Sequence, residues 1–447
     1  MSTPARIVIL GGGFAGATTA LELERLLRRR NDVEIMLLDN ENFFTFTPLL
    51  PEVPSGSIQA QHIVFPLRAL LRKTVVRQAQ VLGVDIETKT VTARHCRACA
   101  DYSVEFDHLV LALGSVPSFF NLSGLEQHAL TMKSLADATT LHAHLIDKLE
   151  HAELEPDEHA RREILTFVVA GGGFAGVETL AEVNDFVRGA GRYYPRIQQS
   201  DIRMVLVHSG DRILPEVSPA LSEYALKKLR SRGIEARLET RLAEFNGRRV
   251  LLNDGDEIPT RTLVWTAGTS PSPLLDKIKV PRLKSGKVEV NATMEVNGRP
   301  GVWALGDIAA IPDAACGSTC PPTAQHALRQ GKRLARNIVA SLEGGKLRPF
   351  AYKPLGLLAG LGRRAAVAEI LGLRFSGFFA WWLWRTIYLM KLPSLERKIR
   401  VALDWTLDLF FPRDMVYLRS LHAVQTPGAP PAASEEKSLA SKRLDIV

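Results

Sequence analysis

Cysteine is scarce in this chain: four occur among 447 residues, and none precedes Cys96. Four thiols are too few for a disulfide-stapled secreted scaffold, and they fit a reducing compartment. The first residues also lack the apolar segment of about seven or more residues that a secretory signal needs, so we expect no secretion. The net charge is +8, but no nucleic-acid-binding motif accompanies it. We therefore expect no nucleic acid as a partner.

The same six residues, Gly-Gly-Gly-Phe-Ala-Gly, occur twice, at 11–16 and at 171–176, each after an apolar, β-branched run. In a Gly-x-Gly-x-x-Gly turn, the first glycine allows the tight turn, the second lets the backbone approach a pyrophosphate, and the third lets the helix pack closely on the strand. The helix N-terminus then directs unpaired N–H groups at the phosphates. The sequence therefore predicts two dinucleotide sites. Their candidate residues are Gly11, Gly13, Phe14, Ala15 and Gly16 in the first and Gly171, Gly173 and Gly176 in the second.

The first copy belongs to a predicted βαβ unit. A strand is expected at 6–10, a helix at 17–27 and a second strand at 33–38, which ends at Asp39. Asp39 lies 23 residues beyond Gly16, where an acidic side chain accepts hydrogen bonds from a ribose diol. A turn or cap aspartate is the alternative.

The second copy repeats this pattern with one departure. A helix is expected at 177–186 and a strand at 203–207, but the strand ends at His208 where an acidic residue is expected for the adenosine ribose of NAD. His208, with Arg212 four positions on, would tolerate or attract a 2′-phosphate. The sequence therefore leaves the choice between NADH and NADPH open.

Other strands also occur in pairs. Residues 106–114 are an apolar run that closes on Gly114, and residues 263–268 repeat this form and close on Gly268. After the second unit, the apolar stretch 301–307 ends in Gly-Asp at Asp307. The sequence therefore predicts an internal duplication, with one unit set into the other.

Together with Asn42-Phe-Phe-Thr-Phe-Thr-Pro-Leu-Leu50 and the helix opening near Pro321, this order of motifs resembles the two-dinucleotide-binding flavoproteins. Within them it is similar to the type II NADH:quinone oxidoreductases, over about residues 5 to 345. The resemblance implies FAD at the first fingerprint, NADH or NADPH at the second, and a quinone as acceptor. It assigns FAD or nucleotide contacts to the following additional positions: Asp39, Thr47, Gly114, His208, Gly268 and Asp307.

Two further positions follow from the same resemblance. Glu178, just after the second fingerprint, becomes the candidate proton-handling or gating carboxylate, with a helix first-turn acid as the alternative. The family pattern Ala-Gln-x-Ala-x-Gln starts here at Ala324 and Gln325, which become the candidate quinone-binding residues. Arg329 replaces its second glutamine, and Gln330 comes one place late.

The cysteines separate branches of this superfamily. A redox Cys pair soon after the first ribose-binding strand is absent, which excludes flavin-dithiol chemistry there. Cys96 with Cys99 and Cys316 with Cys320 have spacings that zinc permits, but no recognised ligand pattern is completed, so we expect no metal. Sulfide:quinone oxidoreductase uses a cysteine persulfide relay, so Cys316 or Cys320 keeps that alternative open.

The C-terminal part is basic and rich in tryptophan. Residues 361–420 hold ten Lys or Arg against five Asp or Glu, and four of the six tryptophans. The apolar stretch 375–390 is interrupted by Arg385 and is shorter than the about 20 residues of a bilayer span. Residues 395–410 place apolar side chains on one helical side, typical of a monotopic membrane anchor. A core-packing helix pair or a dimer interface is the alternative.

We therefore predict an α/β protein with two Rossmann-like dinucleotide-binding domains, one inserted in the other, and a C-terminal amphipathic helical anchor. The expected ranges are 1–125 with 290–345 for FAD, 126–289 for NAD(P)H, 346–424 for the anchor and 425–447 for a disordered tail. The expected function is non-proton-pumping NAD(P)H:quinone oxidoreduction. We expect the enzyme to be peripheral on the cytoplasmic face of the cell membrane, and a homodimer is one expected assembly. The alternatives are another acceptor, or a signalling flavoprotein that resembles apoptosis-inducing factor.

Overall fold

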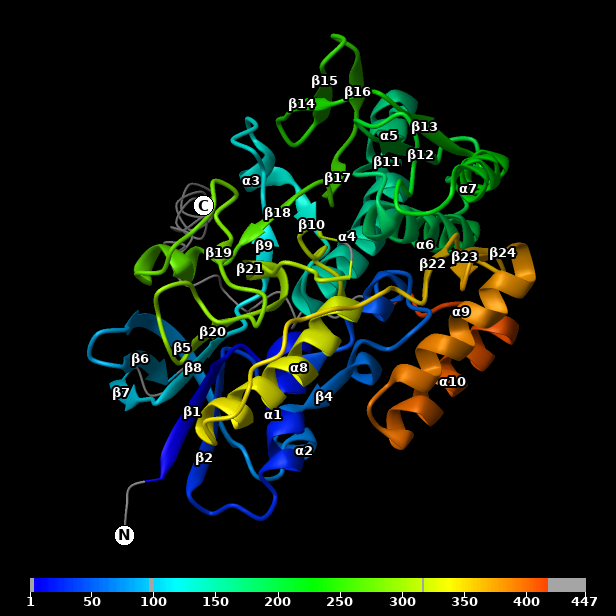
Figure 1. The fold of residues 1–447 in the computed structure, drawn as a ribbon. Helices are drawn as coiled ribbons and strands as arrows, with labels where there is room; N and C mark the ends of the chain where they lie inside the picture. The colour runs from blue at the N-terminus through cyan, green and yellow to red at the C-terminus, as the bar shows by residue number, and fades with distance from the viewer. Residues whose placement is uncertain (1–3, 96–99, 316, 417–447) are drawn as a thin grey trace, which may run out of the picture. The chain divides into compact units, whose positions relative to one another are not determined.

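The computed structural model describes residues 4–95, 100–315 and 317–416. Its first sheet has seven strands in the order β20-β8-β1-β2-β5-β6-β7 (Figure 1). The first five pair in parallel, whereas β5, β6 and β7 form an antiparallel extension. The strands are β1 (Ala5–Leu10), β2 (Val33–Asp39), β5 (Val75–Asp85), β6 (Thr90–His95), β7 (Asp101–Glu105), β8 (His108–Leu111) and β20 (Val302–Ala304).

Two helices cover one face of this sheet. The helices α1 (Phe14–Leu26) and α8 (Ala324–Leu342) pack side by side, although they are about 300 residues apart in the chain (Figure 1). Residues Ile7 to Leu10 of β1 are completely buried, as expected for a parallel strand covered on both faces. The sheet with its helices therefore encloses a continuous apolar core.

The second sheet has five parallel strands in the order β10-β17-β11-β12-β13. A separate antiparallel sheet, β14-β15-β16, lies between β13 and β17 in the chain. The strands are β10 (Leu130–Thr131), β11 (Thr166–Ala170), β12 (Arg203–Val207), β13 (Ile234–Arg237), β14 (Leu242–Phe245), β15 (Arg249–Leu252), β16 (Glu257–Pro259) and β17 (Thr262–Trp265). The helices in this part are α3 (Leu125–His128), α4 (Leu135–Leu154), α5 (Glu158–Ile164), α6 (Phe174–Ala190) and α7 (Pro219–Ser231).

Strand β20 follows the whole second sheet in sequence yet pairs with β8 of the first sheet, so segments on both sides of the second sheet build the first. A two-stranded antiparallel ribbon joins the two parts. The smaller elements are β3 (Phe43–Thr45), β4 (Val64–Pro66), β9 (Ser115–Pro117), β18 (Thr269–Pro271), β19 (Val288–Glu289), β21 (Ala309–Ala310), α2 (Leu67–Leu70), and the 3₁₀ turns η1 (Thr47–Glu52), η2 (Ala60–Ile63), η3 (Gly191–Tyr193), η4 (Pro273–Lys277) and η5 (Gly306–Ile308).

The C-terminal region differs in part from the sequence-based expectation. Residues expected to be helical begin with an antiparallel sheet of β22 (Gly356–Gly360), β23 (Ala366–Ile370) and β24 (Leu373–Ser376). Two helices follow, α9 (Gly377–Lys391) and α10 (Leu395–Phe410). The sheet forms because its small apolar residues, such as Ala366 and Val367, are completely buried against the main core.

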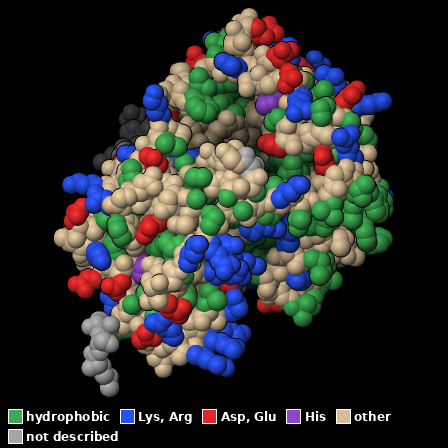
Figure 2. Space-filling view, in the orientation of Figure 1, with side chains coloured by type: hydrophobic (Ala, Val, Ile, Leu, Met, Phe, Trp, Pro, Cys, Tyr) green, Lys and Arg blue, Asp and Glu red, His purple; other side chains and the backbone are tan. Residues whose placement is uncertain are grey.

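The two C-terminal helices are buried on one side and exposed on the other. Trp384 and Trp405 pack into the main core, so the core-packing alternative holds for this side. Hydrophobic side chains gather over α9 at the right of the molecule (Figure 2). The exposed apolar residues are Phe378, Phe379, Trp382 and Met390 of α9 and Leu395, Ile399, Leu403, Leu407 and Phe410 of α10. Within the described ranges, no helix combines the length and apolar character needed to cross a bilayer.

Candidate functional site

The two glycine fingerprints have the same steric design. A Cβ atom at Gly16 would collide with the carbonyl oxygen of Gly11, and one at Gly176 would collide with that of Gly171. Each pair lets a helix approach its strand closely. By contrast, a Cβ at Gly13 would meet nothing within 4 Å. Gly173 is open in the same way. Each middle glycine therefore leaves its backbone accessible to a ligand, as a pyrophosphate requires.

Both helices begin three residues earlier than the sequence indicated, at Phe14 and Phe174. In each case the middle glycine is the N-cap, so the helix starts inside the fingerprint. The first free N–H groups therefore lie within the glycine turn, where they can meet an anion. Phe14 packs edge-on against Phe44 with ring centroids 4.9 Å apart, and Ala15 is buried.

Asp39 lies at the end of β2, beside the first fingerprint. Its Oδ2 accepts the Gly12 N–H at 2.5 Å, and its Oδ1 accepts the Glu41 N–H at 2.7 Å. Burial raises the pKa of the Asp39 carboxyl, while these two donors oppose that shift. A cavity of about 490 Å³ is lined by Gly11, Asp39, Asn40, Gln80, Leu274 and Lys277, among others.

A second cavity of about 500 Å³ adjoins Gly13, Gly114, Ser115 and Lys133, and it shares Gly11 and Asp39 with the first. Gly114 has a φ of +65° and is open on its Cβ side. Together these cavities are lined by the Asp39 carboxylate, by glycines that are open on the Cβ side and by the N-cap glycine of α1. The residues present therefore fit FAD.

Asp307 joins this region from far along the chain. Its Oδ2 accepts the Ser115 hydroxyl at 2.7 Å and lies 3.3 Å from the Lys133 ammonium, which also donates to Ser115 at 2.8 Å. Ser115 and Lys133 were not singled out in the sequence. Ser115 follows Gly114 directly, which was an available signal, but no local pattern marked Lys133.

His208 occupies the place in the second unit that Asp39 occupies in the first. Its Nδ1 accepts the Gly172 N–H at 3.1 Å, as Asp39 accepts that of Gly12. Burial lowers the pKa of the imidazole, so the ring is neutral at pH 7 and carries its proton on Nε2. Arg212 donates to the carbonyl oxygen of Pro215 at 2.8 Å. The site thus presents an imidazole N–H where a carboxylate would accept from a ribose diol.

Glu178 lies near the start of α6, next to β22 of the C-terminal sheet. Its Oε1 accepts the Gly360 N–H at 2.7 Å and the indole N–H of Trp384 at 3.3 Å. Loss of water around the carboxylate raises its pKa to about 8, against these two hydrogen bonds. Glu178 is therefore largely protonated at pH 7. This state suits a group that holds and releases a proton.

Two more glutamates share a cavity with Glu178. Glu52 and Glu182 face the same small space of about 20 Å³, which is room for about one water molecule. Burial raises the pKa of Glu52 to about 7 and also raises that of Glu182. The signal for Glu182 was its position four residues after Glu178, on the same side of one helix. Nothing local marked Glu52.

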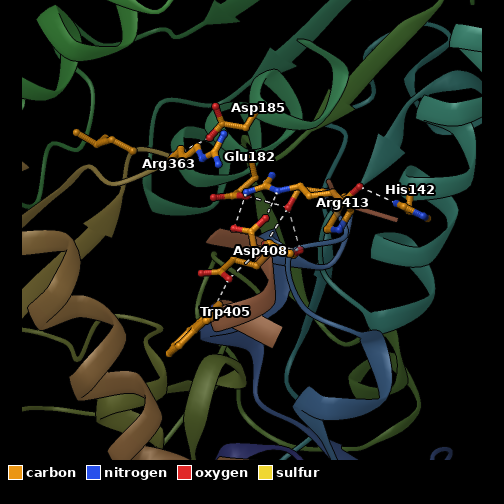
Figure 3. A network of polar contacts seen from close by, with 12 residues as sticks. His142, Glu182, Asp185, Arg363, Trp405, Asp408 and Arg413 are labelled. Atoms are coloured by element: carbon orange, nitrogen blue, oxygen red, sulfur yellow. Dashed lines mark hydrogen bonds and ion pairs between the residues drawn. The ribbon is translucent and has the colours of Figure 1, made fainter. Parts of the chain in front are cut away.

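A network of polar contacts extends from these glutamates into the C-terminal segment (Figure 3). Arg413 donates to Glu182 at 3.1 Å and to Asp408 at 2.7 Å. The Trp405 indole donates to Glu52 at 2.6 Å. Helix α10 therefore supplies the Trp405 indole and the segment after it supplies the Arg413 guanidinium, and both groups contact this acidic cluster.

The expected quinone pattern lies at the start of α8. The side-chain amide of Gln325 donates to the Gly356 carbonyl at 3.0 Å and accepts the Tyr352 hydroxyl at 2.9 Å. The Arg329 guanidinium stacks over the Tyr352 ring at 4.0 Å. Gln330 is buried and accepts the Gly306 N–H at 3.0 Å, next to Asp307. Ala324 is partly buried.

The remaining predicted residues are Thr47, Gly268 and the cysteines. Thr47 is exposed at the start of η1. Gly268 faces the ring of Phe120, and its carbonyl accepts the Ser118 N–H at 3.1 Å. Cys320 is buried, while Cys96, Cys99 and Cys316 lie outside the described residues, as does the predicted tail. The part of the chain that the structure describes holds no group of three or more potential metal ligands.

Comparison with known proteins agrees with this geometry. The family model "Pyridine nucleotide-disulphide oxidoreductase" matches residues 5–331, and the model "NDH2 C-terminal domain" matches residues 355–414. The type II NADH:quinone oxidoreductase Ndh of Mycobacterium tuberculosis is 31% identical over 91% of this chain and 89% of its own length. The chain belongs to the type II NADH:quinone oxidoreductases.

Another relative of this type II enzyme is the demethylphylloquinone reductase NdbB of Synechocystis sp., which is 34% identical over 90% of this chain and 95% of its own. The fold is shared with NDH2 from Plasmodium falciparum, solved in complex with NADH, with a TM-score of 0.86, 20% identity and coverage of 92% of this chain and 99% of that chain. The sequence-based recognition of the family, its redox class and its cofactors is thus confirmed.

Proposed function

We propose that this protein transfers reducing equivalents from NAD(P)H to a quinone on a membrane surface, with FAD held by the first fingerprint. The observation that carries the proposal is the pair of sterically equivalent glycine turns, each with an open middle glycine, in one chain. FAD, when bound, supplies the hydride-accepting and electron-donating chemistry. The protein's side chains bind, orient and manage protons.

The residues divide these tasks. The first fingerprint, Asp39, Gly114 and the Ser115–Lys133–Asp307 cluster hold FAD. The second fingerprint and His208 hold the nicotinamide nucleotide. The arrangement at His208 supports use of NADPH as well as NADH, because no carboxylate there repels a 2′-phosphate.

Glu178 is the proposed proton-handling residue. Its raised pKa keeps the carboxyl protonated at neutral pH, and the two other glutamates that face its cavity can exchange a proton with it. Ala324 and Gln325 flank the proposed quinone site. Because both ends of the Gln325 amide are already hydrogen-bonded, we assign Gln325 the role of positioning Tyr352 and the β22 backbone.

We further propose that the exposed apolar sides of α9 and α10 attach the enzyme to a membrane and admit the quinone. Nine large apolar side chains are exposed on these helices, with basic residues among them. We also propose that the enzyme attaches to the cytoplasmic face of the cell membrane and that it can form a homodimer. A peripheral mode fits, because apolar rings insert while the charges stay hydrated.

One steady-state experiment tests the function. Purified holoenzyme is mixed with NADH or NADPH and a short-chain quinone, and oxidation is followed by loss of nucleotide absorbance. We expect sustained quinone-dependent turnover with both nucleotides. Reduction of the flavin without turnover would instead indicate a signalling flavoprotein. Quinone reduction in a parallel assay with sulfide, and none with NADH or NADPH, would indicate a sulfide:quinone oxidoreductase.

A further inference from the structure

A cavity of about 630 Å³ lies where α6 and α10 end, away from both fingerprints. Its charged lining is unbalanced. Among the lining residues are five arginines and two aspartates, which gives this surface a net charge of +3 (5 − 2). The charged residues are Arg188, Arg192, Arg232, Arg363, Arg413, Asp185 and Asp408.

Two of these arginines are neutralised within the protein. Asp185 pairs with Arg232, and Asp408 pairs with Arg413. Arg188 differs, because its guanidinium donates to neutral oxygens of Asn184, Gln199 and Ile202 at 2.8 to 3.2 Å. Burial lowers the pKa of Arg188, and the neighbouring Arg232 lowers it further.

The other two arginines that line the cavity come from different elements. Arg192 lies in η3, and Arg363 lies in the turn between β22 and β23. Among the described residues, neither guanidinium has an ion-pair partner, and both residues are exposed. The Arg363 backbone N–H donates to Asp185 at 2.6 Å, which fixes the turn, while its side chain extends away from the polar network (Figure 3). The cavity therefore holds three arginines that lack a counter-anion in the described structure.

One edge of the cavity is apolar and exposed. The lining includes Leu409, Phe410, Phe411 and Pro412, and the two phenylalanines are 78% and 63% exposed. Phe410 also continues the exposed apolar side of α10. A soluble anion needs only the cationic part of this site. A phospholipid needs both parts, because its phosphodiester lies beside its own acyl chains.

We propose that this cavity binds the phosphodiester headgroup of an anionic phospholipid, with Arg188, Arg192 and Arg363 as the cationic contacts and Phe410 and Phe411 against the acyl chains. The inference rests on the proposed membrane attachment, and it makes that attachment selective for anionic lipid. It also fixes the C-terminal end of α10 at headgroup depth, so the helix lies in the interface with its apolar side inward.

The test compares two double variants with the same loss of charge. Arg192→Gln with Arg363→Gln removes the two exposed arginines of the cavity. The matched control, Arg364→Gln with Arg374→Gln, removes two exposed arginines of the C-terminal sheet that do not line it. Full-length holoenzyme is titrated with phosphatidylcholine vesicles that contain phosphatidylglycerol and with pure phosphatidylcholine vesicles, and bound protein is measured by flotation.

Two arginines near an anionic surface are worth about 1 kcal/mol each, so the cavity variant should bind anionic vesicles about 30-fold more weakly than the unaltered protein. We expect the control variant to bind anionic vesicles at least tenfold more tightly than the cavity variant does. Binding to neutral vesicles should be equal in all three proteins. Equal losses in both variants would overturn the site in favour of diffuse attraction. Failure of the unaltered protein to bind anionic vesicles would overturn it too.

Two further measurements separate other outcomes. Inorganic phosphate alone, at millimolar concentration, should neither bind by calorimetry nor displace the vesicles; displacement would show a soluble-anion site instead. Oxidation of NAD(P)H with a short-chain quinone in detergent should be unchanged in both variants. If the unaltered enzyme fails that assay while the vesicle result holds, the proposed reaction is wrong and the lipid site stands.

Discussion

At the scale of single residues, we propose that His208 influences the choice between NADH and NADPH. An imidazole that already accepts the Gly172 N–H has one remaining polar atom, the Nε2–H, and that atom is a donor. A ribose diol gains little from it compared with a carboxylate, whereas a 2′-phosphate finds a donor in place of a repelling charge. We therefore expect the His208 side chain to affect discrimination between the two nucleotides more than the fold.

We accordingly predict that His208→Glu raises the ratio of kcat/KM for NADH to that for NADPH by about tenfold, the equivalent of one ribose contact worth about 1 to 2 kcal/mol. Steady-state kinetics with both nucleotides measure this ratio. His208→Gln, which adds no charge, is the control and should change the ratio much less. An unchanged ratio in the glutamate variant would place residue 208 outside the adenosine site.

Glu178 yields a pH prediction. Its pKa of about 8 means that the proton is held at pH 7 and lost as the pH rises through about 8. The kcat of quinone reduction should therefore fall above about pH 8. In Glu178→Gln, kcat at pH 7 should fall by about 100-fold, with little remaining dependence on pH and an unchanged KM for the nucleotide. Glu126→Gln, at an exposed position in α3, is the control. A normal rate and pH profile in Glu178→Gln would leave the residue a structural role only.

At the scale of elements, the segment after α10 is held in place by charge. Arg413 contacts Glu182 and Asp408, and these three side chains are at most 13% exposed. Removing the cation leaves a largely buried carboxylate without its partner, which costs several kcal/mol. The segment thus closes the acidic cluster as well as ending the described fold.

Arg413→Met should lower the free energy of unfolding by about 3 to 5 kcal/mol at pH 8. Without Arg413, the already raised pKa of Glu182 rises further, so the folded protein binds a proton that the unfolded chain does not bind above its ordinary pKa. The loss should therefore shrink as the pH falls toward 5. Thermal and denaturant melts at both pH values measure it. Glu182→Gln in the same chain should restore part of the stability; no restoration would show that Glu182 is not the group left unpaired.

The exposed side of α10 gives a prediction at the same scale. Deletion of the region from Leu361 would also remove Trp384 and Trp405 from the core, so surface substitutions are the cleaner test. Ile399→Asp with Leu403→Asp, at positions 54% and 56% exposed, should weaken flotation with anionic vesicles at least tenfold. Dye reduction by NAD(P)H should remain intact. The matched control is Leu154→Asp with Leu283→Asp, exposed sites elsewhere. Equal flotation in both variants would favour a dimer interface on α10.

At the scale of the whole molecule, FAD should hold distant segments together. Its proposed frame draws on β1, β2, β8 and the Gly-Asp turn at Asp307, which are separated by nearly 300 residues. The purified protein should be yellow, and heat or acid should release intact FAD, because no flavin-linking motif is evident in the sequence. Added FAD should raise the melting temperature of the apoprotein. A colourless protein that takes up no FAD on refolding would contradict the assignment.

Much of this molecule was readable from short segments of sequence. The glycine turns, the strand that ends at Asp39 and the strand 203–207 were predicted because steric limits and apolar runs act over a few residues. The C-terminal strands were missed, because residues 356–376 carry no alternation that separates a short strand from part of a helix. Their small apolar residues become a sheet only by burial against the main core.

The sequence by itself determined two dinucleotide turns, their order and the substitution of His208 for an acid, since each depends on local backbone sterics or on the identity of one residue. Only the tertiary structure decided the state of Glu178, because its burial and its partners Gly360 and Trp384 come from about 180 to 210 residues further on. It alone also brought Lys133 to Asp307 and Trp405 to Glu52. Electrostatic character depends on which groups exclude water and which donors remain, and the packing of distant segments settles both.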